Sequence, residues 1–299
     1  MTATAEKTEP AGTSPARRFG SFKGLWPQWL LFHRRPRLWQ ELLLTGVGYF
    51  LYSKVRNLIP QQESIAQRHA RSVQWLQDRL HLNFELSVNR FVYHHEWLAQ
   101  TMDYYYATMH FVVTIGVLVW LFVARKRVYR GMRTALYATT LFGLAGFFLY
   151  PLAPPRLMPH ARYGYWDTLK LYHTWGSLAD PDVEKHTNQY AAMPSLHIGW
   201  STWCAIAVFF CTRLVWLRVL AVCYPIITLM VIVGTANHFI IDAVGGLIVV
   251  SAGFGVQWLM SGHPAREPAP DPPPGTEPPS WARRPAWLPN WLRAPSWLP

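Results

Sequence analysis

Apolar residues along this chain are gathered into blocks of bilayer length, and polar residues lie mostly between the blocks. A transmembrane helix needs about 20 consecutive, predominantly apolar residues. The pattern predicts six membrane-spanning helices, at residues 39–55, 104–124, 132–152, 196–212, 216–235 and 239–260. The first block is the weakest because it is short and contains Glu41 and Lys54. We therefore expect an all-α, polytopic membrane protein.

The composition supports this interpretation and separates a membrane core from two tails. Of the 299 residues, 51% are hydrophobic, and the 16 Trp and 14 Tyr are residues that favour membrane interfaces. We expect a basic cytoplasmic tail at 1–37, a six-span catalytic domain at 38–260 and a Pro- and Trp-rich cytoplasmic tail at 261–299. Because proline is dense in that last segment, we expect it to be disordered.

Residues 61–80 form a separate amphipathic segment before the second span. Ile65, Val73, Leu76 and Leu80 recur at near-helical spacing, with charged and amide residues between them. The pattern predicts a helix whose apolar face bears these four residues. Such a helix lies either on the outer membrane surface or against the membrane-spanning helices, and the pattern fits both.

The net charge of +12 is concentrated on one side of the predicted topology. Basic residues cluster before the first span, between the second and third, around the fourth connection and in the last tail, whereas the connection at 153–195 balances acids and bases. Because cytoplasmic connections carry the excess of Lys and Arg, we expect both termini in the cytoplasm and the 153–195 connection outside, in a plasma-membrane protein. These basic residues flank apolar blocks, so they do not indicate nucleic-acid binding.

Three short polar motifs fall at span ends that this topology places on the outer face. They are Pro154-Pro155-Arg156-Leu157, Ala192-Met193-Pro194-Ser195-Leu196-His197 and Asn237-His238-Phe239-Ile240-Ile241-Asp242. The topology rests on hydropathy and charge alone. The meeting of all three motifs on one face therefore predicts a functional site there.

The residue types in these motifs suit the transfer of a phosphoryl group. A helix over 238–242 puts His238 and Asp242 on one face, where the carboxylate fixes the imidazole tautomer and raises its basicity. The same spacing also fits a purely structural pair. Arg156 can hold a phosphate through its guanidinium, and Ser195 with the first amides of a helix can bind phosphate oxygens. Two histidines, His197 and His238, allow one to attack phosphorus and the other to protonate the leaving alkoxide, with no metal or cofactor required.

Together the motifs resemble the three signatures of the type 2 phosphatidic acid phosphatase (PAP2) superfamily, in the same order, over roughly residues 60–260. The forms Ala-Ala-Met-Pro-Ser-Leu-His-Ile-Gly-Trp at 191–200 and Tyr-Tyr-Tyr-Ala-Thr-Met-His at 104–110 are most similar to the branch of inositol phosphorylceramide synthases and their bacterial relatives. The resemblance implies a PAP2-like helical core with His238 as a nucleophile that forms a phosphohistidine and Asp242 as its orienting partner. It further implies His197 as general acid, and Arg156 and Ser195 as phosphate ligands.

The chain departs from the phosphatase pattern at three places. Leu196 stands where phosphatases have glycine, no lysine stands at the usual distance before Arg156, and Val231 and Ile232 stand where phosphatases have a Ser-Arg pair. Fewer cationic phosphate ligands favour a lipid phosphotransferase over a phosphatase. We therefore expect an enzyme that acts on a phospholipid or lipid-linked phosphate at the extracytoplasmic face and transfers a phosphoinositol- or phosphosugar-type group.

Other interpretations of the same residues stay open. A lipid phosphate or pyrophosphate phosphatase would use water as the acceptor, a metal-dependent hydrolase would use His197, His238 and Asp242 as ligands, and a transporter would use polar residues within the membrane. Tyr106 and His110, one helical turn apart, fit either a hydrogen bond within their helix or a contact to the substrate. Neither pattern nor composition indicates an oligomeric state.

Overall fold

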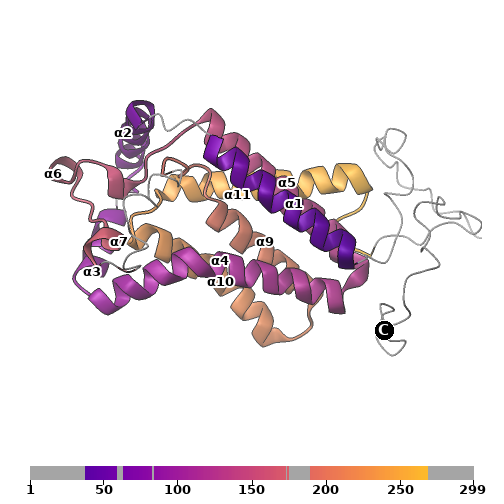
Figure 1. Cartoon of the computed structure of the whole chain (residues 1–299). Coiled ribbons are helices and arrows are strands. Elements are labelled where there is room, and N and C mark those ends of the chain that lie inside the picture. The colour runs from indigo at the N-terminus through magenta and orange to yellow at the C-terminus, as the bar shows by residue number, and fades with distance from the viewer. Residues whose placement is uncertain (1–37, 59–62, 83, 173, 175–188, 269–299) are drawn as a thin grey trace, which may run out of the picture.

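The long helices run side by side along the length of the protein, and several short helices gather at one end (Figure 1). The computed structural model describes residues 38–58, 63–82, 84–172, 174 and 189–268. Its helices are α1 (Leu38–Leu58), α2 (Glu63–Arg79), α3 (Glu85–Tyr93), α4 (Glu96–Ala124), α5 (Lys126–Leu149), η3 (Pro155–Leu157), α6 (His160–Tyr163), α7 (Thr168–Leu171), α9 (Leu196–Cys211), α10 (Val215–Gly234) and α11 (Ile240–Ser261). These residues contain no β-strand, so the prediction of an all-α fold is confirmed.

In the described part of the chain, four helices are long and apolar enough to cross a membrane, namely α4, α5, α10 and α11. Helix α9 is apolar but has only 16 residues, and α1, with 21 residues, carries Glu41 and Lys54. Glu41 accepts hydrogen bonds from Tyr129 and Arg133 of α5, which lowers the cost of an acid in an apolar segment. A membrane protein is therefore supported, and the predicted number of six spans is not confirmed.

Helices α4 and α5 begin earlier than the apolar blocks that predicted them. Helix α4 starts at Glu96 instead of 104, and α5 starts at Lys126 instead of 132. Polar residues continue a helix where their backbone and side chains find partners. Asp103, for example, is buried and accepts hydrogen bonds from the hydroxyls of Thr168 and Thr174, each at 3.0 Å.

Small residues allow α11 to approach its neighbours at backbone distance. A methyl group on Gly253 would lie 2.2 Å from the Thr139 hydroxyl of α5 and 2.6 Å from the Ala135 carbonyl. A methyl group on Gly246 would lie 2.5 Å from the carbonyl oxygen of Ser195, just before α9. Close helix approach through small residues is typical of membrane bundles. Here it brings the third polar motif against the second.

Helix α2 forms as predicted, and it packs on its neighbours through only part of its apolar face. Ala66, Ala70, Val73 and Gln77 are buried and Ile65 is half-buried, whereas Leu76 and Leu80 are 40% and 55% exposed. The buried residues fit packing on the other helices and the exposed leucines fit contact with a membrane surface, so both predicted placements stay open. Small and amide side chains let α2 lie close to its neighbours, and the larger apolar residues point outward.

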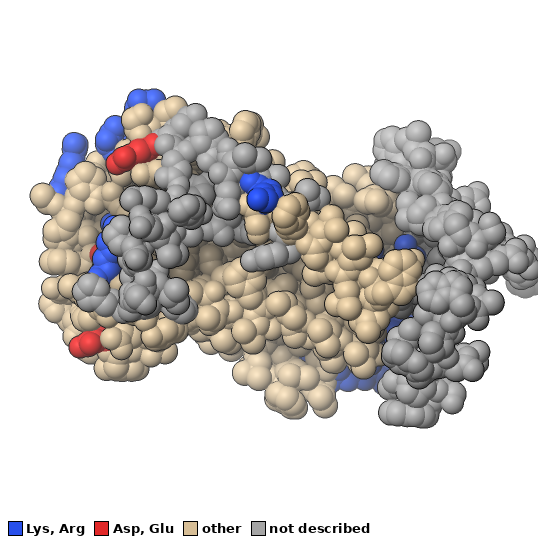
Figure 2. Space-filling view, in the orientation of Figure 1, with Lys and Arg blue, Asp and Glu red and all other residues tan. Residues whose placement is uncertain are grey.

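Among the residues drawn in colour in Figure 2, charged side chains lie mainly toward the two ends of the molecule, and most of the surface between them is uncharged. At the end opposite the short helices, Arg125 donates to the Cys211 carbonyl at 2.8 Å, and Arg266 stacks on Phe210. Basic connections that were predicted to share one side therefore meet at one end of the bundle. The membrane side that this end faces stays a prediction. The tails at 1–37 and 269–299 lie outside the described residues.

Candidate active site

A tight turn joins α10 to α11 and carries His238. Ala236 takes the left-handed conformation, with φ 51°, and the amides of Asn237 and His238 both donate to the Ile232 carbonyl, at 3.0 and 3.1 Å. A left-handed alanine costs about 1 kcal/mol relative to its ordinary conformation. The turn reverses the chain and leaves His238 only 3% exposed.

His238 and Asp242 lie together, but not as two residues of one helix. Helix α11 begins at Ile240 with Phe239 as its N-cap, so His238 precedes the helix. Nδ1 of His238 lies 3.3 Å from Oδ2 of Asp242, and the same oxygen accepts a hydrogen bond from the Phe239 amide at 2.9 Å. The prediction of a helix over both residues is wrong. The two side chains meet because a carboxylate at the third helical position folds back over the helix start.

The contact with Asp242 determines which nitrogen of the His238 ring carries the proton. Since a carboxylate only accepts hydrogen bonds, a neutral His238 holds its proton on Nδ1 and its lone pair on Nε2. Nε2 is buried and has no hydrogen-bond partner among the described residues, and the same holds for Ser195 Oγ and Asp242 Oδ1. Buried polar atoms are nearly always paired. Three such atoms at the adjoining starts of α9 and α11 are typical of a site that binds a polar ligand.

The second motif meets the third through the backbone. The Ser195 amide donates to the Asp242 carbonyl at 3.0 Å, and α9 begins at the next residue. The ring centroids of His197 and His238 are 5.5 Å apart. Both imidazoles and the serine therefore lie in one small region.

Helix α4 forms a wall of this region with Tyr106 and His110. Nε2 of His197 and Nδ1 of His110 lie 3.2 and 3.0 Å from the carbonyl oxygen of Tyr106. A carbonyl only accepts hydrogen bonds, so each of these nitrogens carries a proton. The Tyr106 ring stacks on His197 at 4.3 Å between centroids, and His110 meets His197 edge-on at 4.4 Å. His110 thus makes the expected contact within its helix and also packs against His197.

The first motif reaches the same region through Arg156, in η3. Its amide donates to the Ala236 carbonyl at 2.9 Å, and its Nε donates to Asn237 Oδ1 at 2.9 Å. Its Nη1 donates to Asp167 Oδ2 at 3.0 Å. Arg156 is therefore fixed to the turn between α10 and α11, and its charge is already partly offset by a carboxylate.

Two residues that the sequence did not single out complete the start of α11. Phe239 has no side-chain acceptor, so the next amides need partners elsewhere. Glu85 of α3 accepts from the Ile240 amide at 3.1 Å, and Gln77 of α2 accepts from the Ile241 amide at 3.2 Å. Burial is the main cause that raises the pKa of Glu85 to about 8. The apolar N-cap is the only signal in the sequence that such partners are needed, and it does not identify them.

The ligand set suggested for a metal-dependent hydrolase is not found. Among the residues described, no three His, Cys, Asp or Glu side chains form a group that can hold a metal ion. Asp242 instead directs one oxygen to Nδ1 of His238 and to the Phe239 amide.

These features define a class of protein, the helical membrane proteins in which a buried histidine and carboxylate lie near a second histidine, and an arginine is fixed to the turn that carries the first. A sequence model of the PAP2 superfamily matches residues 71–256, and because this match covers more than half of the chain, the protein belongs to that superfamily. Its members are generally phosphatases and phosphotransferases of lipid phosphates, which supports an enzyme of this kind. Comparisons with curated proteins and with solved structures find no match. The matched range contains all seven residues predicted for the site, Tyr106, His110, Arg156, Ser195, His197, His238 and Asp242.

Proposed function

We propose that the protein is a membrane phosphotransferase that acts on a phospholipid or lipid-linked phosphate through a phosphohistidine on His238. One observation carries this proposal. The buried imidazole of His238 has Nδ1 beside Asp242, and its Nε2 has no hydrogen-bond partner among the described residues. A nucleophilic nitrogen needs a lone pair and a partner that stabilises the positive charge developing during attack. Asp242 supplies that partner.

The reaction proceeds in two steps, each of which replaces one bond to phosphorus with another. Nε2 of His238 attacks phosphorus, the bond from phosphorus to the lipid alkoxide breaks, and His197 gives that alkoxide a proton. An acceptor alcohol then loses its proton to His197 and attacks phosphorus, and the bond to Nε2 breaks. Arg156 and Ser195 bind phosphate oxygens during both steps.

The charge of the site favours a phosphodiester over a phosphomonoester as substrate. Arg156 stands beside the turn that carries His238, and Asp167 offsets part of its charge. A phosphomonoester carries a charge of about −1.5 to −2 at neutral pH, and a phosphodiester carries one negative charge. We therefore propose transfer of a phosphoinositol- or phosphosugar-type group, as in the inositol phosphorylceramide synthase branch, at the extracytoplasmic face of the plasma membrane. A lipid phosphate phosphatase, with water as acceptor, is the second candidate, since the superfamily includes such enzymes.

We also assign substrate contact to Tyr106 and His110. Their support is geometric, because both side chains pack against the ring of His197. Any group that reaches phosphorus between the histidines passes close to this wall of α4.

Trapping the intermediate tests the proposal. The purified protein is incubated with a phospholipid that carries radioactive phosphorus in its head group. We expect label on the protein through a bond that is labile to acid and stable to base, as in phosphohistidine. The label should be absent from His238→Ala and retained by His263→Ala, which changes a histidine beyond the opposite end of α11. A labelled His238→Ala variant would refute the assignment. Label that passes to water even when an alcohol is supplied would instead identify a phosphatase.

A further inference from the structure

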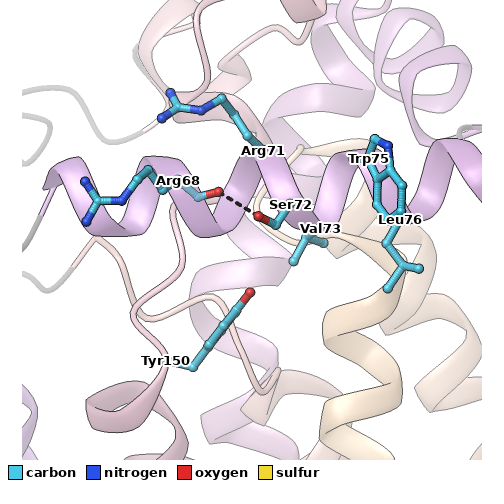
Figure 3. Close-up of a pocket in the computed structure, with 7 residues that line it drawn as sticks. All are labelled: Arg68, Arg71, Ser72, Val73, Trp75, Leu76 and Tyr150. Carbon is cyan, nitrogen blue, oxygen red and sulfur yellow. Dashed lines mark hydrogen bonds between the residues drawn. The ribbon is translucent and has the colours of Figure 1, made fainter.

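A surface pocket of about 700 Å³ lies between α2 and Tyr150, the residue that directly follows α5. Arg68 and Arg71 project from α2 about one turn apart, Trp75 and Leu76 stand further along the helix, and Tyr150 faces the helix from the neighbouring segment (Figure 3). None of the functional residues assigned above lines this pocket.

The pocket has an unbalanced positive charge. Arg68 and Arg71 are both exposed, and neither forms an ion pair with a carboxylate among the described residues. The acidic residues of α2, Glu63 and Asp78, lie more than one helical turn away along the chain. Two guanidinium groups on one helix face bind a phosphate group well, because each offers charge-assisted hydrogen bonds.

The end of α5 directly before Tyr150 carries exposed apolar side chains. Phe148 and Leu149, at the end of α5, are 64% and 76% exposed, and Trp75 on the other wall is 59% exposed. Tryptophan and arginine are both favoured where a membrane meets water. A ligand that fits both parts has an anionic head and apolar chains.

The wall of the pocket is tied to the segment that carries Arg156. The His69 ring stacks on Tyr150, 4.0 Å between centroids, and its Nδ1 contacts the Pro151 carbonyl at 2.8 Å. Gln67 donates to the Leu157 carbonyl at 2.9 Å. An occupant of the pocket therefore contacts a helix that is hydrogen-bonded to Leu157 of the first motif and to Pro151 just before it.

We propose that this pocket binds the phosphate of an anionic glycerophospholipid, whose acyl chains lie along the exposed end of α5. The phosphate contacts Arg68 and Arg71, and the glycerol backbone lies between Trp75 and Tyr150. This site differs from that of His238, and the inference does not depend on phosphotransfer.

Lipid binding by the full chain, purified in a neutral detergent, tests the inference. The probes are phosphatidylglycerol and phosphatidylcholine with the same acyl chains, and bound lipid is counted by native mass spectrometry. We expect phosphatidylglycerol to bind more tightly, with a preference that weakens as salt rises. Arg71→Gln should lower the affinity for phosphatidylglycerol about fivefold, and the double change with Arg68→Gln about twentyfold, since each basic residue near a lipid surface contributes about this much.

The matched control is Arg90→Gln, which removes the same charge from the exposed face of α3 and lies outside the pocket. It should retain the lipid preference. Equal losses for Arg90→Gln and Arg71→Gln would overturn the pocket in favour of a general charge effect. Equal binding of the two lipids by the unmodified chain would also overturn it. So would displacement of phosphatidylglycerol by millimolar inorganic phosphate, which would make the site one for free phosphate.

Discussion

Glu85→Gln should remove a strong pH dependence from the stability of the protein. Glu85 is 1% exposed and holds the amide of Ile240 at the start of α11. Burial raises its pKa from the ordinary 4.5 to about 8, the Ile240 hydrogen bond opposes this rise, and the charge of Asp242 adds to it. Glutamine keeps the carbonyl oxygen that accepts from Ile240 and has no proton to lose.

The sign and size of the effect follow from this raised pKa. Between pH 4.5 and 8 the folded chain keeps the Glu85 proton and the unfolded chain has lost it, so the free energy of unfolding falls as pH rises. Each pKa unit corresponds to about 1.4 kcal/mol, which makes the total loss about 5 kcal/mol. The loss begins above the unfolded pKa, is complete near the folded pKa, and stays constant at higher pH.

The assay is denaturant unfolding in detergent micelles from pH 4.5 to pH 9. Glu85→Gln should match the unmodified chain at the acid end and exceed it by several kcal/mol at pH 8. Glu63→Gln, which makes the same chemical change on the exposed first turn of α2, should follow the unmodified chain at every pH. Parallel curves for Glu85→Gln and the unmodified chain would show that the buried carboxyl does not keep its proton, and the reasoning would fail.

Three further predictions concern packing, catalysis and topology. Gly246→Ala should destabilise the protein by about 1–3 kcal/mol and slow turnover, because the added methyl group meets the backbone just before α9. Gly255→Ala, whose methyl group would have no atom within 4 Å, should have neither effect. Thermal melting and turnover of the two variants test this prediction. Asp242→Asn keeps an acceptor for the helix start and removes the charge, so turnover should fall by about two to four powers of ten while the melting temperature changes little. A large drop in melting temperature together with the loss of turnover would contradict an orienting role. In intact cells whose chain lacks its native cysteines, a cysteine at Lys170 should react with an impermeant thiol reagent and one at Arg127 should not, and the reverse labelling would invert the predicted orientation.

The long helices and the three motifs could be predicted because the length of an apolar block and the residues at its ends are properties of the sequence alone. The helix ends were less predictable. Helix α4 continues through Glu96 to Asp103 because a buried carboxylate finds two threonine hydroxyls from a segment about 65 and 71 residues away in sequence. Local hydropathy contains no information about such partners.

The sequence led us to expect contact between His238 and Asp242, but through a different local structure. A spacing of four residues indicated one helix face, whereas His238 precedes the helix and Asp242 folds back over its start. The left-handed Ala236 also could not be foreseen, because alanine rarely takes that conformation and the turn imposes it. Both features depend on how α10 and α11 are held relative to each other.

The way in which α11 is capped also sets an order of assembly. Glu85 and Gln77 precede the amides that they hold by 155 and 164 residues, so they are synthesised long before their partners exist. A nascent chain that ends before α11 leaves both buried side chains without these amides. His238 reaches its final position only when the last long helix has inserted and docked onto α2 and α3. The candidate site is therefore completed only at the end of biogenesis, and an incompletely inserted chain lacks the assembled contact between His238 and Asp242.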